Sequence, residues 1–278
     1  MYVRVEADGG RRVEAPGSVL AVFDATGVCR GVMPIGDGPT GRLFWGLVSA
    51  DTATEKGLTA KVLDAQAGEV LDIGGTLEFS ADAVLGELGN PLVWHVRPTT
   101  ATLSVTLVQN WNWVSFNVAQ GERTLAEFLA DYTQNATDGD LIKSQSGQAT
   151  YSGGKWYASP ADFRLEAGRM YKLRKQRAGS CTLTVEGAPA DPSSAIAAVK
   201  GWNWIGYTGE ADASIGAIFK EGGFSDNDLL KGQSGGQATF SGGRWYGSVT
   251  FRPGLGYMLK MTASGNVDFR NAKENIVP

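Results

Sequence analysis

Hydrophobic and polar residues alternate in short stretches through the first third of the chain, a pattern typical of half-buried β-strands. Turn-forming residues separate these stretches, for example at 24–27 and 64–68. The stretches predicted as strands are 18–24, 28–34, 42–48, 58–64, 75–79 and 92–96. About seven short strands at this spacing favour a β-sandwich in this part of the chain.

Two later segments are copies of each other. Residues 138–157 read DGDLIKSQSGQATYSGGKWY and residues 226–246 read DNDLLKGQSGGQATFSGGRWY; allowing one extra Gly, fifteen of twenty aligned positions are identical. The similarity extends to further pairs of segments, 110–114 with 201–205 and 165–173 with 251–259. A repeat of about 80–90 residues exceeds solenoid periods and predicts two homologous small β-domains.

Each copy is expected to contain a Trp-Asn-Trp strand, one short helix and a hairpin. Alternation places Trp111 and Trp113 on one face of the strand, and we expect that face to be core because small β-domains bury tryptophan. Thr124 and Glu127 form a capping-box pattern before the helix. Gly-Gly pairs, at 153–154 in the first copy, predict the hairpin turn.

Linker-like sequences divide the chain. A Pro/Ser-rich stretch covers 187–194 and a weaker one covers 97–100. The predicted domains are therefore 1–98, 99–190 and 191–278, and the predicted fold class is all-β with one short helix per repeat.

Composition narrows the class of protein. Of 278 residues, 42% are hydrophobic and 19% are charged, which indicates a globular chain. The net charge is −4, so we expect no nucleic-acid partner. No apolar stretch is long enough to span a membrane. The chain begins with strand-like sequence and not with a signal peptide, and we expect it to be a segment of a longer secreted protein.

Residues suited to catalysis are few. His95 is the single histidine, and the sequence has no zinc-ligand or phosphate-loop pattern. We therefore expect no enzymatic activity and no cofactor. Cys29 and Cys181 fall in different predicted domains, so both are expected to be free thiols.

Paired aspartates recur at matching positions of the two copies, at Asp138 and Asp140 and at Asp226 and Asp228. Paired carboxylates are weak candidates for Ca²⁺. The alternative is a turn in which each carboxylate accepts hydrogen bonds from nearby backbone N–H groups.

Aromatic residues are the most suggestive feature for binding, since six of the eight tryptophans lie in the repeats. Aromatic rings beside amide side chains suit stacking on sugars and hydrogen bonding to their hydroxyls. The alternative is that the rings fill the cores. The candidate ligand-binding residues are Trp156, Tyr157, Gln148, Trp245, Tyr246 and Gln237.

The chain also resembles known modules. Residues 20–32, 61–70, 85–86 and 90–91 resemble an immunoglobulin-like module of large secreted bacterial proteins. Residues 110–175 and 201–261 are similar to the GWNW-type β repeat that often follows it. The resemblance implies an immunoglobulin-like β-sandwich followed by two repeat domains, and it implies export. Copy one departs from the pattern at Ala167 and at 169–170, near its closing turn.

The leading hypothesis is a non-catalytic structural or adhesive module of an extracellular or cell-surface protein. Its partners are then other domains of a larger chain, or a surface polysaccharide or protein. The alternatives are a tandem carbohydrate-binding module and a phage tail-fibre or virion surface domain.

Overall fold

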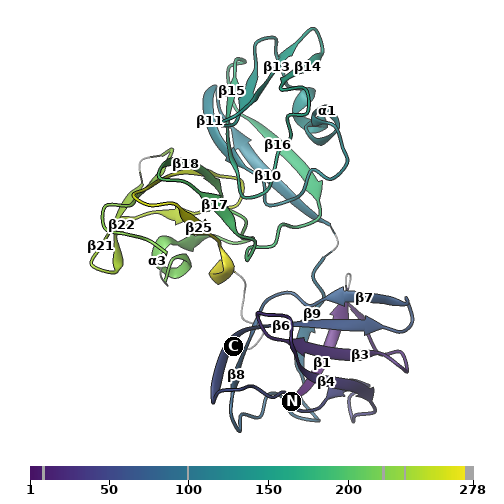
Figure 1. Ribbon diagram of the computed structural model, residues 1–278. Helices are drawn as coiled ribbons and strands as arrows, with labels where there is room; N and C mark the ends of the chain where they lie inside the picture. Colours follow the sequence, from purple (N-terminus) through teal and green to yellow (C-terminus); the bar gives the residue numbers. More distant parts are fainter. Residues whose placement is uncertain (8–9, 99, 221–222, 235, 273–278) are drawn as a thin grey trace. The chain divides into compact units, whose positions relative to one another are not determined.

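The computed structural model describes residues 1–7, 10–98, 100–220, 223–234 and 236–272 (Figure 1). Strands account for 48% of the residues and helices for 6%, which confirms the all-β prediction. The described chain forms two compact units, residues 1–98 and residues 99–272. The last six residues of the predicted third domain lie outside the described part. No described helix is long and apolar enough to cross a membrane.

The first unit is one curled sheet with the order β2-β1-β5-β4-β3-β6-β7, in which β8 also pairs with β6 and β9 with β1. Its strands are β1 (Tyr2–Ala7), β2 (Arg11–Arg12), β3 (Val19–Phe23), β4 (Cys29–Gly36), β5 (Leu43–Trp45), β6 (Thr54–Asp64), β7 (Glu69–Asp72), β8 (Leu77–Ser80) and β9 (Leu92–His95).

The sheet of the first unit curls around an apolar core that includes Val3, Leu20, Val62 and the fully buried Trp94. Strand β9 runs parallel to β1, and the Gly74 amide donates to the His95 carbonyl on its other side. The core side chains come from alternate strand positions, as period-two patterning requires. The finer expectation of an immunoglobulin-like sandwich stays a prediction.

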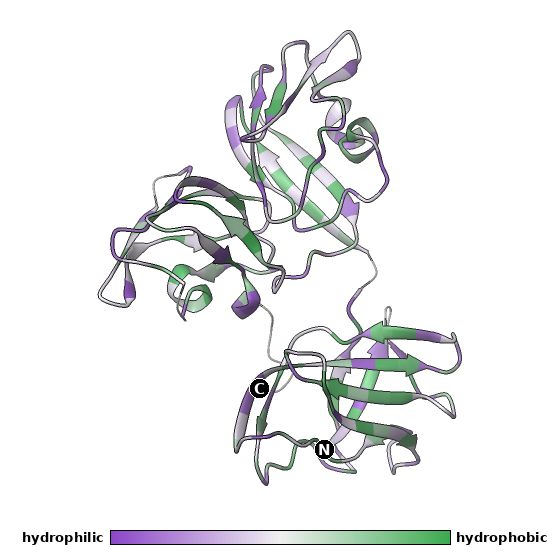
Figure 2. Cartoon of the chain, viewed as in Figure 1, coloured by the Kyte–Doolittle hydropathy of each residue, from purple (hydrophilic) through white to green (hydrophobic). Residues whose placement is uncertain are grey.

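Copy 1, in the second unit, has a two-stranded sheet, β10-β16, and a five-stranded sheet, β11-β15-β12-β13-β14. Its elements are β10 (Ala101–Leu107), β11 (Asn110–Ser115), α1 (Leu125–Phe128), α2 (Ala130–Thr133), β12 (Leu141–Lys143), β13 (Gln148–Ser152), β14 (Lys155–Ser159), β15 (Met170–Lys175) and β16 (Cys181–Gly187). Hydropathy alternates along β10 (Figure 2), whose Leu103, Val105 and Leu107 are buried. The expected single helix is two single turns.

Copy 2 repeats this order, with sheets β17-β25 and β18-β24-β20-β21-β22 and a further short pair, β19-β23. Its elements are β17 (Ile196–Ala198), β18 (Gly201–Gly206), β19 (Ala213–Ser214), α3 (Ile215–Ile218), β20 (Leu229–Gly232), β21 (Gln237–Ser241), β22 (Arg244–Ser248), β23 (Thr250–Phe251), β24 (Gly256–Met261), β25 (Gly265–Val267) and the 3-10 turn η2 (Arg270–Ala272).

Local chemistry explains the helix starts and the hairpins. The Thr124 hydroxyl accepts from the Glu127 amide, and the Glu127 carboxylate accepts from the Thr124 amide, so the predicted capping box is present. The Gly153-Gly154 turn has φ values of +55° and +83°. Glycine reaches these left-handed angles without strain, which is why the turn needs it.

Candidate functional site

The Trp-Asn-Trp strands turn their asparagines inward. Asn112 is 6% exposed and Asn203 is 7% exposed, while Trp111 and Trp113 are half-buried on the other face. The Asn112 side chain accepts from the Val108 amide at 2.9 Å and donates to the Val108 carbonyl at 2.9 Å. The prediction that Trp111 and Trp113 face the core is therefore wrong. A buried amide that satisfies the main chain takes the inner position.

Residues opposite one another on adjacent strands share a face of the sheet, so strand register defines the outer face of copy 1. One row across its five strands is Trp111, Arg174, Leu141, Thr150 and Tyr157. The next row is Trp113, Lys172, Lys143, Gln148 and Ser159.

Copy 2 carries the matching rows. One is Trp202, Lys260, Leu229, Thr239 and Tyr246. The other is Trp204, Met258, Lys231, Gln237 and Ser248. We call these four rows together the tryptophan face. One row of each copy ends in a tyrosine, Tyr157 at 61% exposed and Tyr246 at 49% exposed, and the Arg244 guanidinium lies 4.7 Å from the centre of the Tyr246 ring.

Cations lie over the indole rings of this face. The Lys143 ammonium is 5.0 Å from the centre of the Trp111 ring, and the Lys231 ammonium is 5.5 Å from the centre of the Trp202 ring. The Lys172 ammonium is 5.0 Å from the Trp113 ring and 4.4 Å from the Trp204 ring. Cation–π attraction holds these side chains in place.

The cations of the tryptophan face have no acidic neighbours within it, because its four rows contain neither Asp nor Glu. The ion pairs of the described residues do not involve Lys143, Lys172, Arg174 or Lys231. Burial, and then the neighbouring Lys143 ammonium, lower the pKa of Lys172. The face therefore concentrates positive charge on a chain whose net charge is −4.

The two copies meet along the edge strands of their large sheets. The Ser115 amide donates to the Gly254 carbonyl at 2.9 Å, and the Gly206 amide donates to the Gly168 carbonyl at the same distance. These two contacts occupy equivalent positions in the two copies, so the contact is reciprocal.

Two glutamines complete this reciprocal contact. The Gln145 side chain accepts from the Trp204 amide at 2.8 Å and donates to the Trp202 carbonyl at 3.0 Å. Gln233 makes the same pair of hydrogen bonds to the Trp113 amide and the Trp111 carbonyl. A side-chain amide has the donor and acceptor of a peptide group, so each glutamine pairs with a strand edge as a short neighbouring strand would.

Sequence reasoning did not single out Gln145, Gln233, Asn112 or Asn203. Their available signal was recurrence at matching positions of the two copies. Recurrence does not say which partner a side chain has, and here the glutamine partners lie in the other copy.

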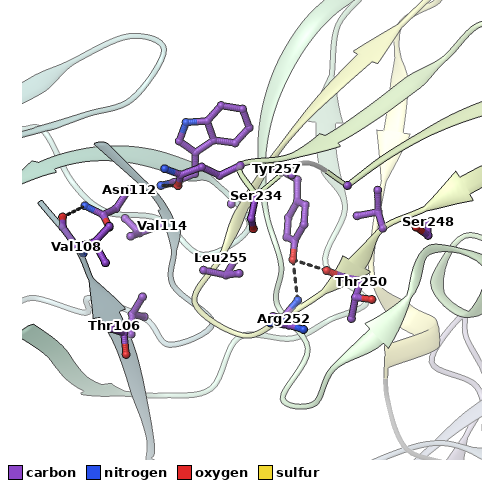
Figure 3. Close-up of a pocket in the computed structure, with 17 residues that line it drawn as sticks. Thr106, Val108, Asn112, Val114, Ser234, Ser248, Thr250, Arg252, Leu255 and Tyr257 are labelled. Carbon is purple, nitrogen blue, oxygen red and sulfur yellow. Dashed lines mark hydrogen bonds between the residues drawn. The ribbon is translucent and has the colours of Figure 1, made fainter. Parts of the chain in front are cut away.

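A cavity of about 570 Å³ lies beside this contact, between β10 and β11 of copy 1 and the segments 232–234 and 248–257 of copy 2 (Figure 3). The Tyr257 hydroxyl points toward the main chain, donating to the Thr250 carbonyl at 2.9 Å and accepting from the Arg252 amide at 2.8 Å. Burial raises the pKa of Tyr257 to about 12. Its phenol is thus neutral and already bonded, which suits a structural role.

The candidate ligand-binding residues separate into two groups. Gln148, Tyr157, Gln237 and Tyr246 belong to the tryptophan face. Trp156 and Trp245 pair with Tyr151 and Phe240 on the opposite side of their sheets and pack against the cores. The Trp156 indole N–H donates to the Thr133 hydroxyl at 3.3 Å. Ligand binding by any of the six residues stays a prediction.

Asp140 and Asp228 each bond within their own turn, accepting from the backbone amides of Thr137 at 3.0 Å and Ser225 at 2.9 Å. Asp140 is buried, and its carboxylate accepts from the Tyr132 hydroxyl at 2.7 Å and from the backbone amide of Gln176 at 2.6 Å. Asp228 accepts from the Thr262 amide and hydroxyl at 2.7 and 2.8 Å.

Asp138 and Asp226, the other member of each pair, bond to the hairpin turns. Asp138 accepts from the Gly153 amide at 2.9 Å and Asp226 from the Gly242 amide at 2.8 Å. These bonds agree with the turn interpretation, and the calcium alternative stays a prediction. Among the described residues, no three His, Cys, Asp or Glu gather as metal ligands do.

The remaining candidates lie elsewhere. The His95 side chain is 71% exposed and lies 4.0 Å from the Glu6 carboxylate. Cys29 is exposed, Cys181 is half-buried, and both are free.

No family model, curated protein or solved structure matches this chain. The resemblance to GWNW-type repeats and to an immunoglobulin-like module therefore stays a prediction.

Proposed function

We propose that the chain is a non-catalytic structural or adhesive module of a secreted or cell-surface protein, in which the two copies act as one stiff body. The observation that supports this most is the reciprocal closure of β11 and β18, each by main chain and a glutamine of the other copy. Export and an immunoglobulin-like first module belong to the same proposal and rest on the resemblance described above.

Covering the edges of β11 and β18 suits such a module for a physical reason. An open edge strand presents unpaired N–H and C=O groups that can pair with another molecule. Here the other copy occupies part of each edge, which prevents that pairing and couples the copies mechanically. A load applied along the chain then meets two copies that must separate before either loses its outer strand.

Force spectroscopy on the full chain tests the proposal. We expect residues 99–272 to unfold in one event, whereas the double variant Gln145→Ala, Gln233→Ala should unfold copy by copy at lower force. Each substitution removes two hydrogen bonds worth about 0.5–1.5 kcal/mol apiece. Gln66→Ala, an exposed change in the first unit, serves as the matched control. Two separate events in the unchanged chain would refute the stiff-body proposal.

A second candidate function, carbohydrate binding, is favoured by the tryptophan face. Its rows place indole and phenol rings beside amide and hydroxyl groups, with Gln148 and Gln237 at equivalent positions. The exposed Tyr157 ring can stack on a sugar, and the amide and hydroxyl groups can bond to the sugar hydroxyls. Two such surfaces on one body can bind a polymer with avidity.

A further inference from the structure

We infer that the tryptophan face binds a negatively charged polysaccharide that extends across both copies. The inference rests on the carbohydrate-binding function proposed above and adds to it the charge of the ligand and the continuity of the site. The central group is Lys172, whose ammonium lies over Trp113 of its own copy and Trp204 of the other. One cation thus joins the two halves of the face.

The charge of the ligand follows from the cations of this face that form no ion pair with another described residue. Lys143 and Lys172 are register partners on adjacent strands, about 4.8 Å apart in backbone spacing. Like charges in directly opposed positions destabilise a sheet. Carboxylates or sulfates of a bound polymer would relieve that repulsion, and Arg174 and Lys231 extend the cationic strip to either side.

The sugar character of the ligand follows from the remaining groups on the face. Gln148, Thr150 and Tyr157 supply an amide and two hydroxyls toward one end of the rows, which suits a polymer rich in hydroxyl groups. Each of the four indoles already carries a Lys over one face, so a bound polymer would meet cations, hydroxyls and amides more than bare indole rings.

The geometry of the copies makes one extended site from two equivalent ones. The glutamine contacts hold Trp111 and Trp113 of one copy and Trp202 and Trp204 of the other at the shared border. A polymer that binds one half is thus presented to the second half at high effective concentration. Short oligosaccharides are accordingly expected to bind much more weakly than long chains.

Binding to matched polymers tests the inference with the full chain. The probes are polygalacturonate with its methyl-esterified form, dextran sulfate with dextran, and poly-dT, each titrated by calorimetry at two salt concentrations. We expect binding to the charged member of each polysaccharide pair, weakened by salt because screening reduces the attraction. The uncharged members should bind at least tenfold more weakly.

Residues that differ at equivalent positions of the two copies indicate which substitutions the fold should tolerate. Lys172→Met places in copy 1 the residue that copy 2 has at Met258, so the fold should accept it. This change should weaken binding about fivefold, in the range for one exposed ionic or cation–π contact. Met258→Lys should strengthen binding by a similar factor. Lys220→Met, an equal charge change at an exposed position after α3, should leave the affinity unchanged.

The other possible binding results overturn different parts of the inference and of the proposed function. Equal binding of charged and uncharged polymers, unaffected by Lys172→Met, would overturn the inference and leave carbohydrate binding standing. Binding of none of the polysaccharides would overturn both. Tighter binding of poly-dT than of any polysaccharide, lost in Lys172→Met, would assign the face to nucleic acid.

Discussion

Replacing Asn112 should show most clearly which side of the Trp-Asn-Trp strand is buried. Its side chain is buried and accepts from the Val108 amide at 2.9 Å. It also donates to the carbonyls of Val108, Asn110 and Leu173, at 2.9, 3.1 and 3.3 Å. The substitution Asn112→Ala removes all four hydrogen bonds and leaves a void where the amide was.

The expected loss of stability follows from the strength of these four hydrogen bonds. The two bonds of 2.9 Å to Val108 are the best formed, and each contributes about 0.5–1.5 kcal/mol. The two longer bonds go to strand carbonyls and contribute less, while a donor left without a partner adds its own cost. We therefore expect Asn112→Ala to lower the free energy of unfolding of the second unit by about 2–3 kcal/mol.

Urea unfolding followed by tryptophan fluorescence measures this loss. Six of the eight tryptophans lie in the repeats, so the signal reports mainly on the second unit. Hydrogen exchange at the Val108 amide gives a local readout, because that amide loses its acceptor. Asn203→Ala in copy 2 should behave alike, since Asn203 bonds to Val199 in the same way.

The control is Asn110→Gly. Asn110 has φ +75° and copy 2 already has Gly201 at the equivalent position with φ +103°, so this change should leave the unfolding midpoint nearly unaltered. An unchanged midpoint in Asn112→Ala, with Val108 exchanging as slowly as before, would refute the assigned role of the buried amide.

Three further outcomes can be measured on the same chain. Trp113→Ala should cost less than the about 3–5 kcal/mol of a fully buried aromatic ring, because Trp113 is half-buried; a loss in that range in urea would contradict its outer position. Hydrogen bonds, foremost from the Thr26 hydroxyl, lower the pKa of Asp24 to about 2. The stabilisation this gives the first unit is present above about pH 4 and should be lost as pH falls toward 2; acid unfolding that Asp24→Asn leaves unchanged would exclude it. In a thiol assay without denaturant, exposed Cys29 should react faster than Cys181, since Cys181 is half-buried and burial raises its pKa. Equal rates would contradict that difference.

Several features of the fold follow from local sequence and were predicted correctly. Alternating patterns produce most of the strands, because a half-buried sheet needs an apolar residue at every second position. The Gly-Gly turns at 153–154 and 242–243 form where predicted, with left-handed angles at both glycines. The capping box at Thr124 forms because its partners are three residues apart. None of these features depends on a distant part of the chain.

The burial of the Trp-Asn-Trp strand shows where local information ends. Alternation separates Trp113 from Asn112 onto opposite faces, and that separation is observed. It does not say which face is inside. The answer depends on the main-chain groups of Val108 and Leu173 that Asn112 can reach only in the folded copy. Hydrophobicity alone favoured the wrong side.

The sequence by itself therefore determined the strand class, the duplication and the turns, since these rest on neighbouring residues. Only the tertiary structure decided the tryptophan face and the contact between the copies. Lys143 and Lys172 are far apart along the chain and become neighbours through strand register. Gln233 reaches the edge of β11 from more than a hundred residues away. Such pairings arise because a sheet brings together strands from distant positions, and no local pattern records which strands will be adjacent.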